Sequence, residues 1–257
     1  MDYKLVIRTA VLAGELMLLS GAETYRVEDT MNRILQTAGT QTAEALVFRT
    51  GILATIDDPD IEPVTMMHRV KASGTNLNRI MQVNAISRKY CAGEMTLLEA
   101  YEGLGSIQKK KYKIRHYNLA TIIIPAGFAP LFGGQMPEML LSALAGALLA
   151  LIITAAKKWK VNGLISDVVS SFVVVMAVFL LGIKMTGVNI DVVIISAIMP
   201  LVPGVAITNA VRDIVQGDYM SGNARVLEAF LTAAGIAIGA GAGMWLARLL
   251  IGGGMAG

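Results

Sequence analysis

The feature that most limits what this chain can fold into is a set of long apolar runs after His116. Five runs carry few charged residues, at 118–134, 138–156, 161–183, 190–211 and 226–251. Each approaches the roughly 20 residues that a helix needs to cross a hydrocarbon core about 30 Å thick. Because hydrocarbon offers no hydrogen bonds to the backbone, these runs are predicted to be transmembrane helices.

Composition divides the chain into two regions. Of the 257 residues, 54% are hydrophobic and only 16% are charged, whereas a soluble domain carries about 25% charged residues. The charges crowd the part before His116, where helical and strand-like patterns alternate. We therefore expect an α-helical polytopic membrane protein with about five transmembrane helices, preceded by a small soluble α+β domain. The predicted domains are 1–115 and 116–257, with helices at 3–19, 23–38, 76–91 and from 96, and strands within 45–56 and 64–71.

Basic residues set the expected orientation, since short loops rich in Lys and Arg stay in the cytoplasm. If the basic cluster at 109–115 lies inside, the opposite face receives only Lys184 and Arg248. The N-terminal domain is then cytoplasmic, and no secretory signal peptide is visible before it. The cluster is better explained by attraction to anionic membrane lipid than by a nucleic-acid partner. The basic residues placed inside with it are Lys157, Lys158, Lys160, Arg212 and Arg225.

Enzyme and metal motifs are missing from the sequence. Cys91 is the only cysteine and the chain has two histidines, which excludes an internal disulfide framework and a Cys-rich metal site. No Walker A, G-x-S-x-G or H-E-x-x-H pattern occurs. We expect no cofactor and no metal, and a transporter rather than an enzyme.

Helix-breaking residues fall near the middle of two predicted spans. Proline removes a backbone donor and frees a carbonyl one turn earlier, which is costly in hydrocarbon unless a cavity or a substrate uses it. Paired interruptions of this kind indicate a transport site, and the alternative is that the prolines only kink the helices. The substrate-pathway candidates are Pro125, Gly127, Pro130, Pro200, Pro203, Gly204, Thr208 and Asn209.

Two further groups in the membrane region are candidates for function. Asp167 is the most deeply placed carboxylate, which suggests proton coupling, although it could equally cap its helix. The segment between the last two runs is rich in charge, and it could gate the cytoplasmic side or only anchor the helices. Its candidate residues are Arg212, Asp213, Gly217, Asp218 and Arg225. In the last run, Gly235, Gly239 and Gly243 have the spacing of close helix packing.

In the N-terminal domain, charge concentrates at the start of the second predicted helix. Glu23 and Arg26 are one turn apart and could pair. Glu28 and Asp29 could bind a cation or a substrate, and the alternative is a solvated helix face.

Two sequence blocks resemble the threonine/serine exporter family: GELMLLSGAETYRVEDTM at 14–31 and PLVPGVAITNAVRDIVQGDYMSGNAR at 200–225. The similarity extends through the whole chain. It matches the larger subunit of a split, two-subunit form, which implies a hetero-oligomer with a small membrane subunit that supplies the complementary spans. The matching positions are Gly21, Glu23, Arg26, Glu28, Asp29, Pro200, Pro203, Gly204, Asn209, Arg212, Asp213, Gly217, Asp218 and Gly222.

The resemblance implies a secondary-active exporter in the bacterial cell membrane, moving threonine and serine or a dicarboxylate such as succinate. A small amino acid or dicarboxylate is therefore the expected substrate. The alternative is a membrane-anchored hydrolase or a regulatory subunit that acts through residues 1–115.

Overall fold

The computed structural model describes residues 1–71, 74–109, 114–183 and 185–252. They form two compact units. The first unit is Met1–Lys111 with Gly204–Glu228, and the second is Tyr112–Pro203 with Ala229–Gly257. Most of the basic cluster predicted to lie beside the membrane falls at 110–113, outside the described residues.

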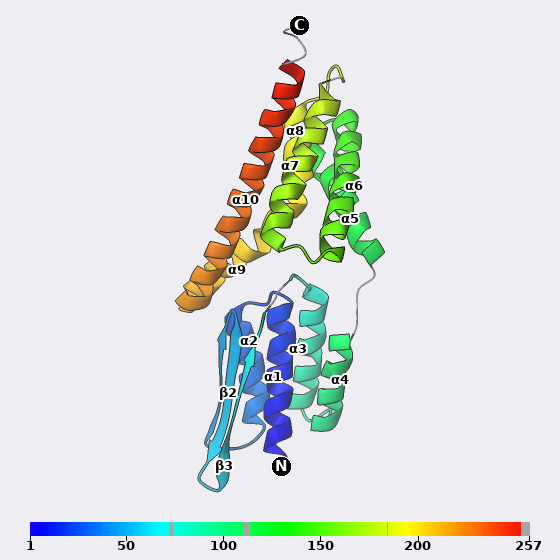
Figure 1. Ribbon diagram of the computed structural model, residues 1–257. Helices are drawn as coiled ribbons and strands as arrows, with labels where there is room; N and C mark the ends of the chain where they lie inside the picture. The colour runs from blue at the N-terminus through cyan, green and yellow to red at the C-terminus, as the bar shows by residue number, and fades with distance from the viewer. Residues whose placement is uncertain (72–73, 110–113, 184, 253–257) are drawn as a thin grey trace. The chain divides into compact units, whose positions relative to one another are not determined.

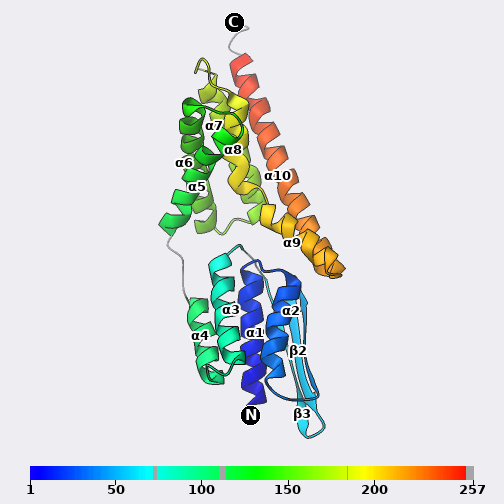
Figure 2. The ribbon, with the colours of Figure 1, turned by 180° about the vertical axis from the view of Figure 1, so that it is seen from behind.

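The first unit combines helices with one small antiparallel sheet, as the sequence predicts (Figures 1 and 2). The sheet has the order β1-β2-β3, and Ala45 of β1 pairs with Ala54 of β2. The apolar stretch 45–56 thus forms two strands joined by a tight turn. The elements are α1 (Tyr3–Leu19), α2 (Thr24–Gln36), β1 (Thr42–Phe48), β2 (Gly51–Asp58), β3 (Ile61–Arg69), α3 (Leu77–Cys91), α4 (Leu97–Lys109), α9 (Gly204–Val215) and the first turns of α10 (Tyr219–Gly252).

The core of the first unit is built around α1. This helix contacts β2 and β3 as well as α2, α3 and α4, so it is apolar over most of its circumference. Val6, Ile7, Leu16 and Met17 are fully buried. Glycine at position 14 lets α2 approach, because a Cβ there would lie 2.3 Å from the sulfur of Met31.

All the regular secondary structure in the described residues of the second unit is helical. Three helices are long and apolar enough to cross a membrane, namely α6, α7 and α10, and α8–η1 with α9 forms a fourth if this interrupted pair is one span. The predicted count of five is not confirmed, since the polar first turns of α5 lower its mean hydropathy. The elements are α5 (Ile114–Leu131), α6 (Met136–Lys158), α7 (Gly163–Gly182), α8 (Ile190–Ile198), the short 3-10 helix η1 (Met199–Leu201) and the remainder of α10.

The two proline-containing segments behave differently. The chain breaks at Val202 and Pro203 and restarts as α9 at Gly204, as predicted. The interruption expected in α5 is wrong, because this helix runs through both Pro125 and Pro130. Pro125 cannot donate to the Thr121 carbonyl, one turn earlier. That oxygen lies 2.7 Å from where a Cβ of Gly146 would stand, so close packing of α6 covers the freed carbonyl.

The glycines of α10 allow close packing against α7, as predicted. A Cβ at Gly239 would lie 2.3 Å from the carbonyl oxygen of Val168, and one at Gly243 would lie 2.4 Å from that of Phe172. Side chains at these positions would collide with backbone, which cannot yield cheaply. The two helices are therefore held at a separation that only glycine permits.

Candidate functional site

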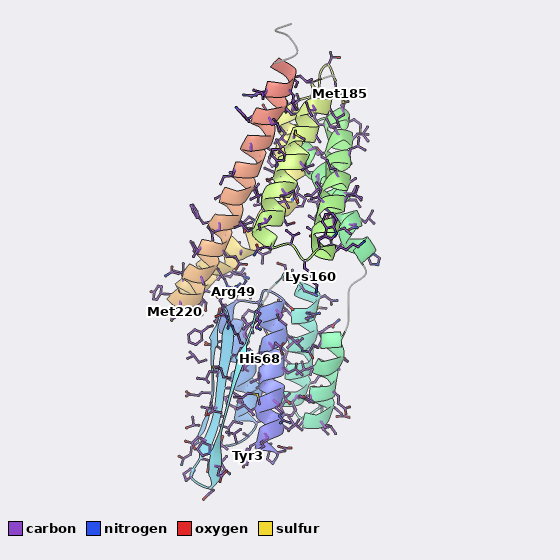
Figure 3. All side chains as sticks on the ribbon, in the orientation of Figure 1. Tyr3, Arg49, His68, Lys160, Met185 and Met220 are labelled. Atoms are coloured by element: carbon purple, nitrogen blue, oxygen red, sulfur yellow. The ribbon has the colours of Figure 1, made fainter. Side chains whose placement is uncertain are left out.

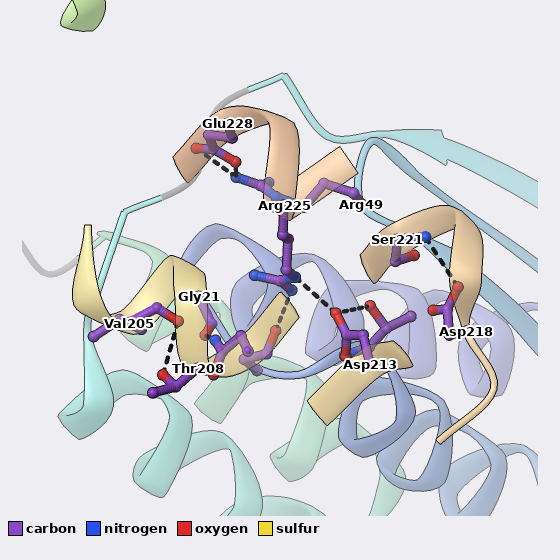
Figure 4. A network of polar contacts seen from close by, with 12 residues as sticks. Gly21, Arg49, Val205, Thr208, Asp213, Asp218, Ser221, Arg225 and Glu228 are labelled. Atoms are coloured by element: carbon purple, nitrogen blue, oxygen red, sulfur yellow. Dashed lines mark hydrogen bonds and ion pairs between the residues drawn. The ribbon is translucent and has the colours of Figure 1, made fainter. Parts of the chain in front are cut away.

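A buried polar network joins the turn between α1 and α2 to a helical hairpin of the first unit (Figure 4). We call the segment Gly204–Glu228 the α9–α10 hairpin. It comprises α9, a short turn and the start of α10. Although about 190 residues separate the two parts in sequence, both belong to the first unit. The chain continues from each end of the hairpin into the second unit.

An ion pair between Asp213 and Arg225 is the centre of this network. The Arg225 Nε donates to Asp213 Oδ2 at 2.8 Å, and the two residues are 4% and 0% exposed respectively. Asp213 also accepts from the Thr24 backbone N–H at 3.0 Å and from the Thr24 hydroxyl at 3.2 Å. The N-cap residue of α2, Glu23, makes no side-chain capping bond. The Asp213 carboxylate, which is distant in sequence, thus accepts from a backbone N–H in the first turn of α2. The helix dipole favours negative charge at this end of the helix.

The turn itself presents carbonyl groups to the hairpin. Arg225 Nη2 donates to the Ala22 carbonyl at 2.7 Å, and Asn209 Nδ2 donates to the Gly21 carbonyl at 2.7 Å. Gly21 has φ +80°, and a Cβ there would lie 2.8 Å from the Gly74 carbonyl oxygen. Glycine is required here both by the backbone conformation and by the space.

Glu23 adds a second charged contact between the turn and the hairpin. Its carboxylate pairs with Arg212 of α9 and, at 3.1 Å, with Arg26 of its own helix. The predicted Glu23–Arg26 pair is thereby confirmed. Burial opposes ionisation of Glu23, but a backbone N–H and the two arginines outweigh it, so its pKa lies below the usual value.

Further charged residues near the network have partners within the first unit. Arg49 pairs with Glu228 at 2.8 Å. Glu28 accepts from the Val47 backbone N–H at 2.9 Å. Burial is the main cause that raises the pKa of Glu28, and repulsion from Asp218 and Asp213 adds to it.

Three other residues of the blocks 14–31 and 200–225 have local roles. Asp29 pairs with Arg33 at 2.9 Å, and Asp218 accepts from the Ser221 N–H at 3.0 Å at the start of α10. Gly217 has φ +90° and forms the turn between α9 and α10. In the described part of the chain, no three His, Cys, Asp or Glu side chains are arranged to hold a metal ion.

The second unit contains a separate cavity of about 240 Å³ lined by Asp167 and Pro200. Asp167 and Pro200, which the sequence indicates separately as candidates for proton coupling and for the substrate pathway, thus line one cavity. Lys157 and Tyr117 also line it, with the Lys157 ammonium 3.6 Å from the centre of the Tyr117 ring. Such a contact stabilises a cation. The capping alternative for Asp167 is wrong, because Asn162 caps α7 by accepting from Leu164 N–H.

The other pathway candidates do not gather at this cavity. Pro125, Gly127 and Pro130 lie along α5, where Gly127 and Pro130 are exposed. Asn209 belongs to the first-unit network, and Thr208 donates back to the Gly204 carbonyl at 3.0 Å.

Several candidate residues were not found from sequence. Thr24 lies inside a recognised motif, but nothing in the local pattern ties it to Asp213. In the sequence, Lys157 indicates only the orientation in the membrane, and no pattern marks Tyr117 as a candidate site residue. Three fully buried serines within apolar runs have hydroxyls without a hydrogen-bond partner in the described residues: Ser142, Ser170 and Ser196.

Comparison with known proteins identifies the family of the chain. The model of the family described as "Putative threonine/serine exporter" matches residues 8–247. A similar protein is the "Probable threonine/serine exporter" of Mycobacterium tuberculosis, which is 24% identical over 245 residues. The alignment covers 91% of this chain but 45% of that protein, so the chain spans less than half the length of this relative. No solved structure matches the chain. The family model covers nearly the whole chain, and the chain belongs to the threonine/serine exporter family.

Proposed function

We propose that this chain is one subunit of a secondary-active exporter that moves small carboxylate metabolites out of the cell. Family membership supports membrane export. The substrate class is threonine and serine, as the name of the mycobacterial relative suggests, or a small dicarboxylate such as succinate. A carboxylate is the feature that these substrates share.

The observation that carries the proposal is the break at Pro203 in an apolar segment, followed directly by a hairpin with a buried ion pair. A helix interrupted within a membrane exposes backbone groups that a polar substrate can use. Pro200, Pro203 and Gly204 would shape this part of the pathway. The hairpin begins at Gly204, directly after the break. Its contacts with the Gly21–Thr24 turn therefore limit how α9 can move. We assign Arg212, Asp213 and Arg225 to a cytoplasmic gate that holds this position.

The cavity beside Pro200 is the proposed site of ion coupling. Asp167 supplies a carboxylate that can take up and release a proton. Lys157 and Tyr117 supply a cation and an aromatic face in the same cavity. Exchange of substrate for protons is the expected mode of transport, with Asp167 as the coupling residue.

We further propose a second membrane subunit as partner. The resemblance to the split, two-subunit form of the family implies a separate small protein that provides the complementary spans. The complex is assigned to the bacterial inner membrane, with the N-terminus in the cytoplasm. The contacts of Arg212 and Arg225 with the N-terminal domain agree with this orientation, since the basic-residue rule assigns both to the cytoplasmic side.

The test is efflux of labelled threonine, serine and succinate from cells or liposomes that contain the chain with and without the small subunit. We expect efflux only with both subunits, and we expect Pro203→Leu to abolish it by closing the break. Pro63→Leu, an exposed proline of β3, is the matched control and should transport normally. Efflux that survives Pro203→Leu would reject the pathway, and efflux without the small subunit would reject the two-subunit complex.

The alternative of a hydrolase or regulatory subunit predicts the opposite pattern. Substrate turnover by residues 1–115 alone, with no effect of Pro203→Leu, would favour it.

A further inference from the structure

A polar cavity of about 290 Å³ lies between α2 and α3 and takes no part in the proposed transport pathway. Its lining comes from one face of each helix, because positions three, four and seven apart lie side by side on a helix. The residues are Arg26, Asp29, Thr30 and Arg33 of α2, and Asn84, Ser87 and Arg88 of α3. Its volume lies at the lower end of the roughly 300–1,000 Å³ of small-molecule pockets, which favours a ligand of few atoms.

The charge of the lining selects an anion. Three guanidinium groups face a single carboxylate, and that carboxylate is already neutralised, because Arg33 Nε contacts both oxygens of Asp29 at 3.0 and 2.9 Å. Arg88 makes no ion pair with any described residue. Arg88 therefore keeps an unpaired charge, and Arg26 shares the single Glu23 carboxylate with Arg212. Positive charge is thus in excess, in the planar form that suits carboxylate and phosphate oxygens.

The floor of the cavity provides neutral hydrogen-bonding groups. Thr30 and Ser87 line the cavity and are only 6% and 5% exposed, whereas the side chains of Arg26 and Arg33 are 40% and 64% exposed. Thr30 Oγ1 donates to Asn84 Oδ1 at 3.4 Å, which leaves the Asn84 amide nitrogen as a donor. A cavity with guanidinium groups at its rim and hydroxyl and amide groups at its base differs from a solvated basic surface, where no group is buried.

We propose that this cavity binds a small oxyanion with two negative charges. One of its negative charges can pair with Arg88, and the other can compete with Glu23 for Arg26. Inorganic phosphate and malonate represent its two possible forms, a tetrahedral phosphate and a dicarboxylate.

Arg26 connects this site to the network at the α9–α10 hairpin. It lines the cavity and also holds Glu23 at 3.1 Å, and Glu23 in turn pairs with Arg212 of α9. An anion competes with Glu23 for Arg26. Binding of the anion therefore alters the charge contacts of the turn that docks the hairpin. This regulatory consequence rests on the proposed function, whereas anion binding does not.

Calorimetric titration of the purified full chain in detergent, with phosphate or malonate at low ionic strength, tests the site. Wild-type protein should bind one of the two anions, and Arg88→Gln should weaken that binding by about 10-fold or more. Lys89→Gln is the matched control, since Lys89 is the exposed neighbour of Arg88 and does not line the cavity. It should change the affinity by less than about 2-fold. Both residues are exposed, so neither variant should unfold the protein.

Glu23→Gln provides the second measurement. It releases Arg26, so anion affinity should rise several-fold. Absence of binding by both anions, or equal weakening by the Arg88 and Lys89 variants, overturns the site. Because the titration needs no transport, its failure leaves the exporter proposal standing, and a failed efflux assay leaves the anion site standing.

Discussion

Replacing Asp213 with asparagine should release the α9–α10 hairpin from the first unit while leaving the rest of the fold intact. The side chain keeps its shape, and its Oδ1 can still accept from the Thr24 N–H at 3.0 Å. What disappears is the negative charge 2.8 Å from Arg225 Nε. Since Arg225 is 4% exposed, its buried charge would lose its ion-pair partner and keep the Ala22 carbonyl as acceptor.

The expected magnitude follows from that burial. Removing one partner of a buried ion pair costs about 3–5 kcal/mol, and a loss of about 4 kcal/mol lowers the docking equilibrium roughly 1,000-fold. Asp218→Asn is the matched control. The Asp218 carboxylate accepts from the Ser221 N–H at the start of α10, and asparagine caps helices about as well as aspartate.

Amide hydrogen exchange of the full chain in nanodiscs measures this effect directly. In Asp213→Asn, amides of α9 and of the turn before α2 should lose protection, whereas those of β2 and α3 should keep it. Adding Arg225→Met should restore much of the protection, because the uncompensated charge is gone. Equal exchange in Asp213→Asn and Asp218→Asn would refute the reasoning, since the buried pair would then contribute nothing to docking.

Three further outcomes follow from particular positions. Burial raises the pKa of Glu28 above its ordinary value, so the free energy of unfolding should fall as the pH rises from the ordinary pKa through the folded one. Thermal unfolding between pH 4 and 8 should show this decline in the wild type but not in Glu28→Gln. Gly239→Val should destabilise the chain in detergent by more than about 2 kcal/mol through collision with a backbone carbonyl of α7, whereas Gly241→Val, which meets no atom within 4 Å, should leave its melting temperature nearly unchanged. Gly21→Ala should cost more stability in chemical unfolding than Gly39→Ala, because both have positive φ but only Gly21 lacks space for a Cβ; equal losses would show that backbone strain alone decides.

Local signals were sufficient for most of the first unit. The glycines at 21 and 39 have φ +80° and +68°, and they end α1 and follow α2 where the sequence predicts helix ends. The break at Pro203 was also predicted, because proline and glycine adjoin an apolar helix on both sides. In each case the residues within one helical turn decide the structure.

Long-range packing explains what sequence could not supply. Thr24 and Asp213 lie 189 positions apart, and nothing near either residue identifies the other. The same holds for Pro125. Proline near the middle of a span predicted an interruption, but α5 continues through it, and Gly146 lets α6 pack closely over the freed carbonyl. Asp167 and Pro200 were each suspected alone, but only the folded chain places them at one cavity.

The orientation of α9 explains why its docking depends on polar groups. Asn209 and Asp213 are buried, whereas Val211 and Val215 are 56% and 76% exposed, and Met220 follows at the tip of the hairpin with 73% exposed (Figure 3). This is the reverse of an amphipathic helix on a soluble protein. Where lipid surrounds a helix, apolar contacts give little preference, because hydrocarbon solvates apolar side chains as well as protein does. A buried ion pair is costly to open in either surrounding. The polar face can therefore hold the hairpin to the domain, while the apolar face stays available to lipid or to the proposed second membrane subunit.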